Sequence, residues 1–239
     1  LKYRKIHPSP KPPALLKEII EFFTKSGGKV LDPFAGVGGT LLGAALAGGG
    51  REAVGVELEQ KYIDAYRKVC EKENIQEMTM LRDDARNLLA HPEVSDTVFD
   101  LVVADPPYSD MMAKERTGQR KKLYKDSSPM PYTDQDCDLG NMALEDFYEA
   151  LRDIMGKCFT RLKPKGYMVI FCKDFQPQPG APNLLHADIV RELGEIPGLV
   201  YRGMRIWHDQ AMSLYPFGYP YSFVMNQIHQ YILIFRKEV

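Results

Sequence analysis

The chain has 239 residues, of which 44% are hydrophobic, and a formal net charge of -1. This length is enough for one sizeable α/β core with little left for a second, so we expect a single domain over residues 1–239. The balanced charge excludes a strongly basic protein and leaves any contact with nucleic acid to local patches.

Targeting and metal signals do not emerge from the sequence. No apolar run approaches the roughly 18 residues that span a bilayer, and the first residues contain no apolar signal region. The 4 cysteines and 5 histidines have neither disulfide nor zinc-ligand spacing. We therefore expect a cytoplasmic protein that needs no membrane and no metal.

A proline-rich segment opens the chain. Residues 7–13 read His-Pro-Ser-Pro-Lys-Pro-Pro, which cannot form a helix. An amphipathic helix is expected directly afterwards, over residues 14–23. On residue chemistry alone, this segment is an arm that leads into the helix.

A glycine-bearing turn follows the first predicted strand. Residues 29–32 form that strand, Gly36, Gly38 and Gly39 form the turn, and residues 41–47 have helical spacing. Glycines let the backbone approach a ligand closely, and a helix N-terminus offers free N–H groups, so a nucleotide-like ligand is expected. The dinucleotide fingerprint fits poorly because Leu41 stands at its third glycine, and no Walker lysine follows.

Acidic residues end the next predicted strands. Glu57 closes a strand over residues 53–57, where a carboxylate can accept both hydroxyls of a ribose, although it could instead cap the helix over residues 59–73. In that helix Tyr62 and Tyr66 lie on the apolar face and are expected in the core.

Two further strands are predicted next. The strand over residues 78–81 precedes Asp83 and Asp84, either of which could cap the following turn. The apolar strand over residues 99–104 delivers Asp105, Pro106, Pro107 and Tyr108 at its carboxyl end.

The order of these motifs resembles that of a known enzyme family. Asp32-Pro33-Phe34 with its glycine turn, Glu57 and Asp105-Pro106-Pro107-Tyr108 are similar to the motifs of S-adenosylmethionine-dependent methyltransferases that modify exocyclic amines of nucleic-acid bases, the DNA N6-adenine and N4-cytosine group. The close of the chain, residues 226–237, is also similar to that family, with Gln230 where an acid is usual.

The resemblance implies a role for each matching residue. It places His7 and Lys11 against the methionine end of S-adenosyl-L-methionine, Glu57 on its ribose and Asp84 on its adenine amine. It also implies that the cofactor contacts the loop residues Asp32, Pro33, Phe34, Gly36, Gly38 and Thr40.

The chemistry of amine methylation accounts for the residues after the strand over 99–104. An exocyclic amine is a poor nucleophile because its lone pair is delocalised into the ring. The Asp105 carboxylate and the Pro106 carbonyl, made rigid by Pro106 and Pro107, can accept its hydrogens. Tyr108 is expected to give an extruded base a flat face for stacking.

A polar connection over residues 109–141 separates this motif from the last third of the chain. Such a length is unusual in a compact domain unless the connection is functional or disordered. Its basic half is expected to contact phosphates and close over the substrate, and a solvated loop is the alternative. The basic residues are Lys114, Arg116, Arg120, Lys121, Lys122 and Lys125, and Asp134, Asp136 and Asp138 follow.

Regular elements return after this connection. Helices are predicted over residues 144–162 and 184–193, a turn over 163–166, and strands over 167–172, 199–206 and 231–235. The aromatic residues Tyr215, Phe217, Tyr219, Tyr221 and Phe223 could line a base pocket or pack a loop, and His229 is expected to be structural or at a rim.

Seven strands alternating with helices predict an α/β fold with a doubly wound, mainly parallel sheet, and the resemblance implies a class I, Rossmann-like methyltransferase whose last strand returns as an antiparallel edge. The expected reaction is methylation of adenine N6 in double-stranded DNA with the base flipped. Cytosine N4, guanine N2 of RNA, and a non-catalytic subunit of a methyltransferase pair are the alternatives. No stretch is large enough for a separate recognition domain. Target recognition by the connection over residues 109–141, recognition by a partner or a missing segment, and low sequence specificity are the three explanations.

Overall fold

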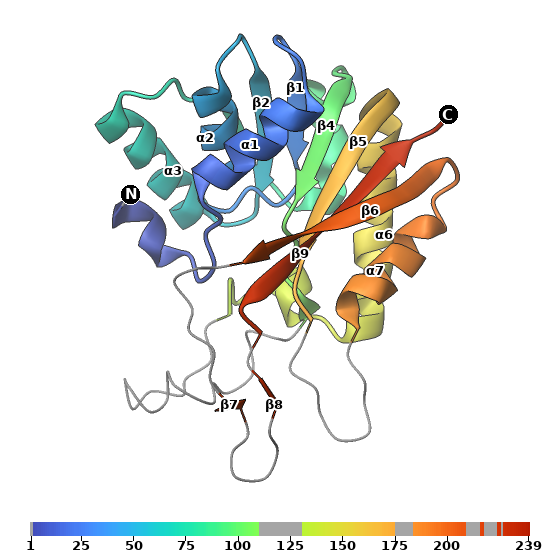
Figure 1. Ribbon diagram of the computed structural model, residues 1–239. Coiled ribbons are helices and arrows are strands. Elements are labelled where there is room, and N and C mark those ends of the chain that lie inside the picture. Colours follow the sequence, from blue (N-terminus) through green and yellow to red (C-terminus); the bar gives the residue numbers. More distant parts are fainter. Residues whose placement is uncertain (1, 110–130, 175–183, 209–215, 218–223, 226) are drawn as a thin grey trace.

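The computed structural model describes residues 2–109, 131–174, 184–208, 216–217, 224–225 and 227–239. Seven strands form one sheet in the order β3-β2-β1-β4-β5-β9-β6 (Figure 1). Two further strands of two residues each, β7 (Pro216–Phe217) and β8 (Val224–Met225), pair with each other and are not part of this sheet. The sheet strands are β1 (Lys29–Asp32), β2 (Glu52–Glu57), β3 (Thr79–Arg82), β4 (Phe99–Ala104), β5 (Leu162–Cys172), β6 (Leu199–His208) and β9 (His229–Lys237).

The predicted doubly wound sheet is confirmed, with one correction to the place of its last strand. β1 to β5 pair in parallel, and β9 is antiparallel to both of its neighbours. However, β9 lies between β5 and β6, so β6 and not β9 forms that edge of the sheet. The physical reason is burial: Leu233 and Phe235 of β9 are fully buried, whereas Met204 and Ile206 of β6 are largely exposed and suit an edge.

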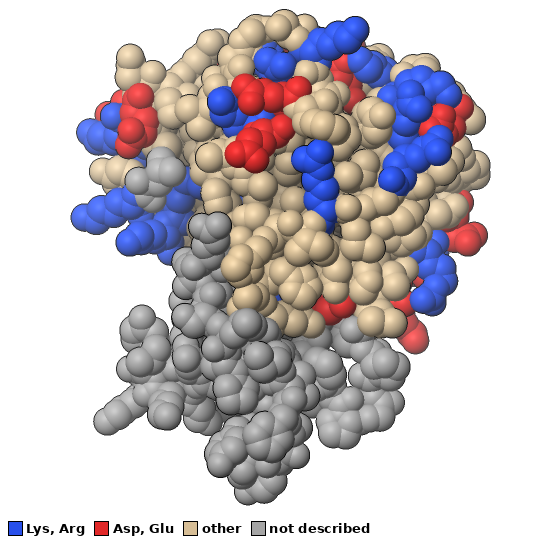
Figure 2. Space-filling view, in the orientation of Figure 1, with Lys and Arg blue, Asp and Glu red and all other residues tan. Residues whose placement is uncertain are grey.

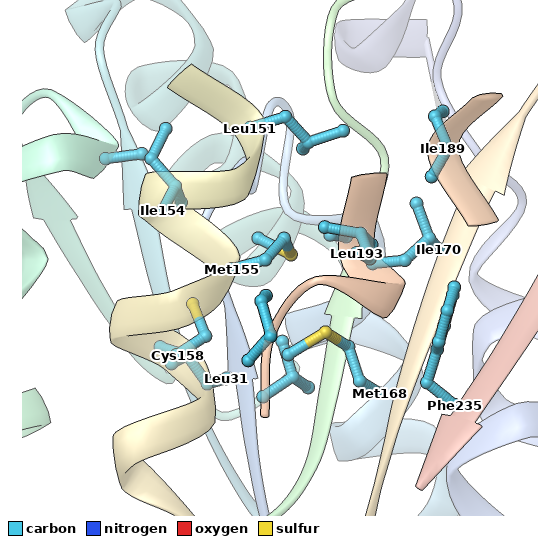
Figure 3. Close-up of a cluster of buried hydrophobic side chains, with 14 of the residues drawn as sticks. Leu31, Leu151, Ile154, Met155, Cys158, Met168, Ile170, Ile189, Leu193 and Phe235 are labelled. Carbon is cyan, nitrogen blue, oxygen red and sulfur yellow. The ribbon is translucent and has the colours of Figure 1, made fainter. Parts of the chain in front are cut away.

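Helices cover both faces of the sheet (Figure 1). Leu16, Leu41 and Ile63 from the first three α-helices pack on one face, and Leu151 and Ile189 pack on the other. Figure 3 shows the second cluster, with Leu31 and Met168 of the sheet among its members. The helices are η1 (Lys2–Ile6), α1 (Pro13–Phe23), α2 (Gly39–Ala47), α3 (Gln60–Glu73), η2 (Ala85–Ala90), α4 (Pro92–Ser95), η4 (Leu139–Asn141), α6 (Leu144–Arg161) and α7 (Leu185–Gly194).

One predicted turn is part of a strand. The turn expected over residues 163–166 lies inside β5, which begins at Leu162 and continues to Cys172. The pairing with β4 nevertheless jumps from Phe99 opposite Leu162 to Leu101 opposite Tyr167. Lys165 also has a positive φ of 65°. The turn residues therefore form a bulge, because the extra residues have no partners in β4.

Some expectations fall on residues outside this description. The basic residues of the 109–141 connection occupy positions 114–125, and Tyr215, Tyr219, Tyr221 and Phe223 also lie outside the described residues. Within the described part of the chain, no helix combines the length and apolar character that crossing a membrane requires.

Candidate functional site

A cavity of about 920 Å³, measured with its solvent-open part, lies where β1, β2 and β4 end. Carboxyl ends of parallel strands are where ligands bind in open α/β sheets. Most of the residues singled out in the sequence line this cavity: His7, Lys11, Asp32, Pro33, Phe34, Gly36, Thr40, Glu57, Asp84, Asp105 and Pro107. Gly38, Pro106 and Tyr108 are not among its lining residues.

Two glycines of the turn, Gly36 and Gly38, have different structural roles. Gly36 has a φ of 51°, and its N–H donates to Glu57 Oε2 at 2.7 Å on the cavity wall. Gly38 has a φ of 71° and is the N-cap of α2. A Cβ on Gly38 would lie 2.2 Å from the Tyr66 ring, so this glycine is required by packing. The expected contact of Gly38 with a ligand has no support in the cavity lining.

Two carboxylates lie in the wall with unusual proton affinity. Burial raises the pKa of Asp32 to about 7, although Thr40 and the Phe34 N–H donate to it. Burial likewise raises the pKa of Glu57 to about 7, although the backbone N–H groups of Glu59 and Gly36 donate to it and lower its pKa. These donors do not compensate fully for the loss of water, so both carboxylates are suited to further N–H or O–H donors from a ligand.

The N-terminal segment forms another wall of the cavity. His7 lies against Tyr62, with ring centroids 4.8 Å apart, and its Nδ1 accepts from the Ser9 N–H at 3.2 Å. Burial, with the charges of Lys11 and Arg4 nearby, lowers the pKa of His7 to about 3, so its imidazole is neutral at pH 7. Arg4 is buried, lines the cavity and donates to the Val37 and Lys11 carbonyl oxygens.

Asp105 lies at the carboxyl end of β4, and both of its oxygens accept a hydrogen bond. Lys11 Nζ donates to Oδ2 at 2.5 Å, and the Tyr108 hydroxyl donates to Oδ1 at 2.7 Å. Tyr108 is only 5% exposed and packs in the core below the sheet edge. The structure therefore differs from the expectation that Tyr108 gives a base an open stacking face, because its ring is covered by core residues and its hydroxyl is used by Asp105.

Asp84 has the capping role that the sequence left open. It is the N-cap of η2, and its Oδ1 accepts from the Arg86 backbone N–H at 2.9 Å. The Arg86 guanidinium pairs with the same carboxylate at 2.5 Å. Asp84 also lines the cavity, so its predicted contact with a ligand stays a prediction.

Residues 131–141, the covering segment, complete the cavity wall. Lys61 Nζ and the Tyr62 hydroxyl both donate to the Tyr132 carbonyl oxygen, at 3.3 and 3.0 Å. The Cys137 carbonyl oxygen accepts from Arg86 at 2.7 Å. Thr133 and Asp138 of this segment also line the cavity. The segment therefore lies against α3 and η2 and forms part of the cavity wall.

Sequence reasoning missed several of these wall residues. Tyr62 was expected in the core, and it does lie buried, but it also lines the cavity; Tyr66 lies in the core as predicted. Tyr132 and Arg4 belong to no motif. The available signals were an aromatic residue in an otherwise polar connection, and an arginine just before the proline-rich segment.

Comparison with known proteins agrees with this geometry. Residues 2–68 match the model of a DNA methylase family, N6_N4_Mtase. Over 102 residues the chain is 32% identical to a tRNA (guanine(10)-N2)-dimethyltransferase of Methanothermobacter thermautotrophicus. This alignment covers 43% of this chain and 28% of that protein. Over 68 residues it is 43% identical to the type II methyltransferase M2.DpnII of Streptococcus pneumoniae, covering 28% of this chain and 25% of that protein.

Solved structures match over nearly the whole chain. TrmN from Thermus thermophilus superposes with a TM-score of 0.56 at 17% identity, covering 94% of this chain and 48% of that chain. A putative rRNA-methylase from Clostridium thermocellum superposes with a TM-score of 0.54 at 15% identity, covering 95% and 99%. The aligned regions span about a quarter of the two curated relatives. The partial matches are therefore to the N6/N4 methylase family and to a tRNA methyltransferase, and the chain shares its fold with solved class I S-adenosylmethionine-dependent methyltransferases.

Proposed function

We propose that this protein transfers a methyl group from S-adenosyl-L-methionine to an exocyclic amine of a nucleic-acid base. The observation that carries the proposal is the position of Asp105. Its carboxylate lies at the end of β4 and lines the same cavity as the glycine turn and Glu57. A ligand bound along the glycine turn and an amine hydrogen-bonded to Asp105 would therefore share one cavity.

The residues present fit the proposed cofactor. Glu57 and Asp32 are acceptors in the cavity wall whose pKa values are raised by burial, and ribose hydroxyls and an ammonium group are donors of the matching kind. A Cβ on Gly36 would lie 3.1 Å from His7 Nε2, so the glycine allows His7 to lie close to the turn in the cavity wall. When bound, S-adenosyl-L-methionine supplies the methyl group.

The role of Asp105 is to accept hydrogen bonds from the target amine. Drawing the amine hydrogens toward a carboxylate weakens delocalisation of the nitrogen lone pair into the ring, which makes the nitrogen a better nucleophile. Pro106 and Pro107 restrict the backbone after Asp105, so the Pro106 carbonyl acceptor and the Asp105 carboxylate are held in place. No covalent bond between protein and base is needed.

Adenine N6 in DNA is the substrate that we favour. The match to a DNA methylase family and the identity to M2.DpnII support this choice. Guanine N2 in RNA is the second candidate, because the alignment with the tRNA dimethyltransferase is longer, at 102 residues. A partner subunit could contribute target recognition in either case.

The test is methyl transfer from labelled S-adenosyl-L-methionine to unmethylated DNA and, separately, to unmodified tRNA, followed by mass spectrometry of the nucleosides. We expect N6-methyladenine from DNA. N4-methylcytosine or N2-methylguanine would identify the substrate as one of the alternatives, and absence of label in both nucleic acids would contradict the proposed activity of the chain acting alone.

In the variant Asp105→Asn, the rate of methyl transfer is expected to fall by at least about 100-fold, which is typical for removal of a positioned charged group. Its affinity for S-adenosylhomocysteine is expected to change by only a few fold. The matched control is Asp100→Asn at the opposite end of β4, where Asp100 accepts from the Lys29 N–H. Equal activity of Asp105→Asn and wild type would contradict the role assigned to this carboxylate.

A further inference from the structure

Lys11 makes a contact that its position in the sequence did not predict. The family resemblance assigns it to the cofactor, but its Nζ lies 2.5 Å from Asp105 Oδ2. The Lys11 side chain is 7% exposed and the Asp105 side chain 23%. The Lys11 ammonium also lies 5.5 Å from the centroid of the Phe171 ring. Lys11 therefore joins the N-terminal segment to the end of β4 through a largely buried ion pair.

The other Asp105 oxygen is held from a different direction. The Tyr108 hydroxyl donates to Oδ1 at 2.7 Å, so each carboxylate oxygen has one protein donor. Rotation about the terminal torsion of an aspartate is otherwise broad, and two donors on opposite oxygens restrict it. An ionised carboxylate has about four lone-pair positions, so acceptor positions remain for a target amine.

The charges of the groups near Asp105 are a further part of its environment. Asp32 lies near enough for its charge and that of Asp105 to act on each other. Tyr108, Tyr132 and Cys172 face Asp105 as well, and each is neutral at pH 7 because burial raises its pKa. Among these neighbours Lys11 is the cation, and its ammonium lies 2.5 Å from the Asp105 carboxylate.

We propose that Lys11 is a positioning residue for Asp105: with Tyr108, it fixes the plane of the carboxylate and directs the free acceptor positions toward the target amine. This inference rests on the proposed function, since it assigns a role within the same site. It predicts that Lys11 contributes to the rate of transfer and little to cofactor affinity.

The variants Lys11→Gln and Lys11→Arg distinguish positioning of Asp105 from binding of the cofactor. With saturating S-adenosyl-L-methionine, we expect kcat to fall about 100-fold in Lys11→Gln and less in Lys11→Arg, while calorimetric affinity for S-adenosylhomocysteine stays within 3-fold of wild type. The matched control is Lys17→Gln, since the Lys17 side chain on α1 is 41% exposed and forms an ion pair with Glu21 at 3.5 Å. Retained cofactor affinity shows that the variants are folded.

A chemical rescue gives a readout that a purely structural role would not change. In Lys11→Ala, added propylammonium is expected to restore kcat at least 10-fold, because a small cation can occupy the vacated space beside Asp105. A 10-fold loss of cofactor affinity with unchanged kcat would overturn the inference in favour of cofactor binding. Unchanged kcat and affinity would overturn it outright. Inactivity of the wild type on every nucleic acid would instead count against the proposed function.

Discussion

The carboxylates at the ends of β1 and β2 both line the cavity. Asp32 and Glu57 lie where hydration is reduced, and each pKa is raised to about 7 mainly by burial. The charge of Asp32 adds to the shift at Glu57. Such groups destabilise the folded protein when ionised, and hydrogen-bond donors from a ligand would offset that cost.

Stability should therefore decrease with rising pH through this range. A carboxyl group with a higher pKa in the folded state binds its proton more tightly when folded, so its contribution is full below pH 4.5 and is lost as pH rises through about 7. We expect urea denaturation to show a lower free energy of unfolding at pH 7.5 than at pH 5. Glu57→Gln should lose less over this range, by on the order of 1–3 kcal/mol. Parallel pH profiles for variant and wild type would refute the assignment.

The covering segment shows how a stretch without periodicity becomes part of a site. Its backbone oxygens accept from side chains of α3 and η2, at Tyr132 and Cys137. Within the segment, Thr133 donates to Asp138 at 2.9 Å and Asp138 accepts from the Gly140 N–H at 2.8 Å. These local bonds give the segment a defined shape against the helices.

Loosening one of these contacts should weaken ligand binding more than stability. Tyr62→Phe removes the hydroxyl that donates to the Tyr132 carbonyl oxygen. Since one such bond contributes about 0.5–1.5 kcal/mol, affinity for S-adenosylhomocysteine should fall about 2- to 10-fold in calorimetry. Tyr148→Phe is the control, because it removes a comparable bond from α6 to Asp188. Equal affinities of both variants would argue against a role for this contact.

The whole molecule is a sheet with helices on both faces and a mixed surface charge. The face in Figure 2 shows basic and acidic side chains interspersed around a broad uncharged area, with no single basic field among the residues described there. This agrees with the net charge of -1. The described residues on this face therefore form no concentrated positive charge that would attract nucleic acid over a long range.

Insertion of β9 between two neighbours makes it central to stability. Phe235 of β9 is fully buried, in the cluster shown in Figure 3, and lies 5.5 Å from the Tyr201 ring. Phe235→Ala should lower the free energy of unfolding by about 3–5 kcal/mol in urea denaturation. The control Phe22→Ala, at a position 65% exposed, should cost far less. Similar losses for both variants would contradict the central place of β9.

The local elements and the main motifs that line the cavity could be predicted from the residues alone. Asp32, Glu57 and Asp105 each follow a short apolar run, and parallel strands bring their carboxyl ends to one edge regardless of side-chain detail. Hydrophobic periodicity also determined α1 and α3 to within a residue or two. Gly36 and Gly38 were recognisable as a turn because the backbone requires φ values that other residues avoid.

Contacts between residues that are far apart in the chain could not be predicted in this way. Lys11 and Asp105 are 94 residues apart, and no spacing rule connects a proline-rich arm to the end of β4. The same holds for Tyr62 with Tyr132, and for β9 between β5 and β6. Periodicity reports which face of an element is buried, whereas the partner of that face depends on packing of the whole chain.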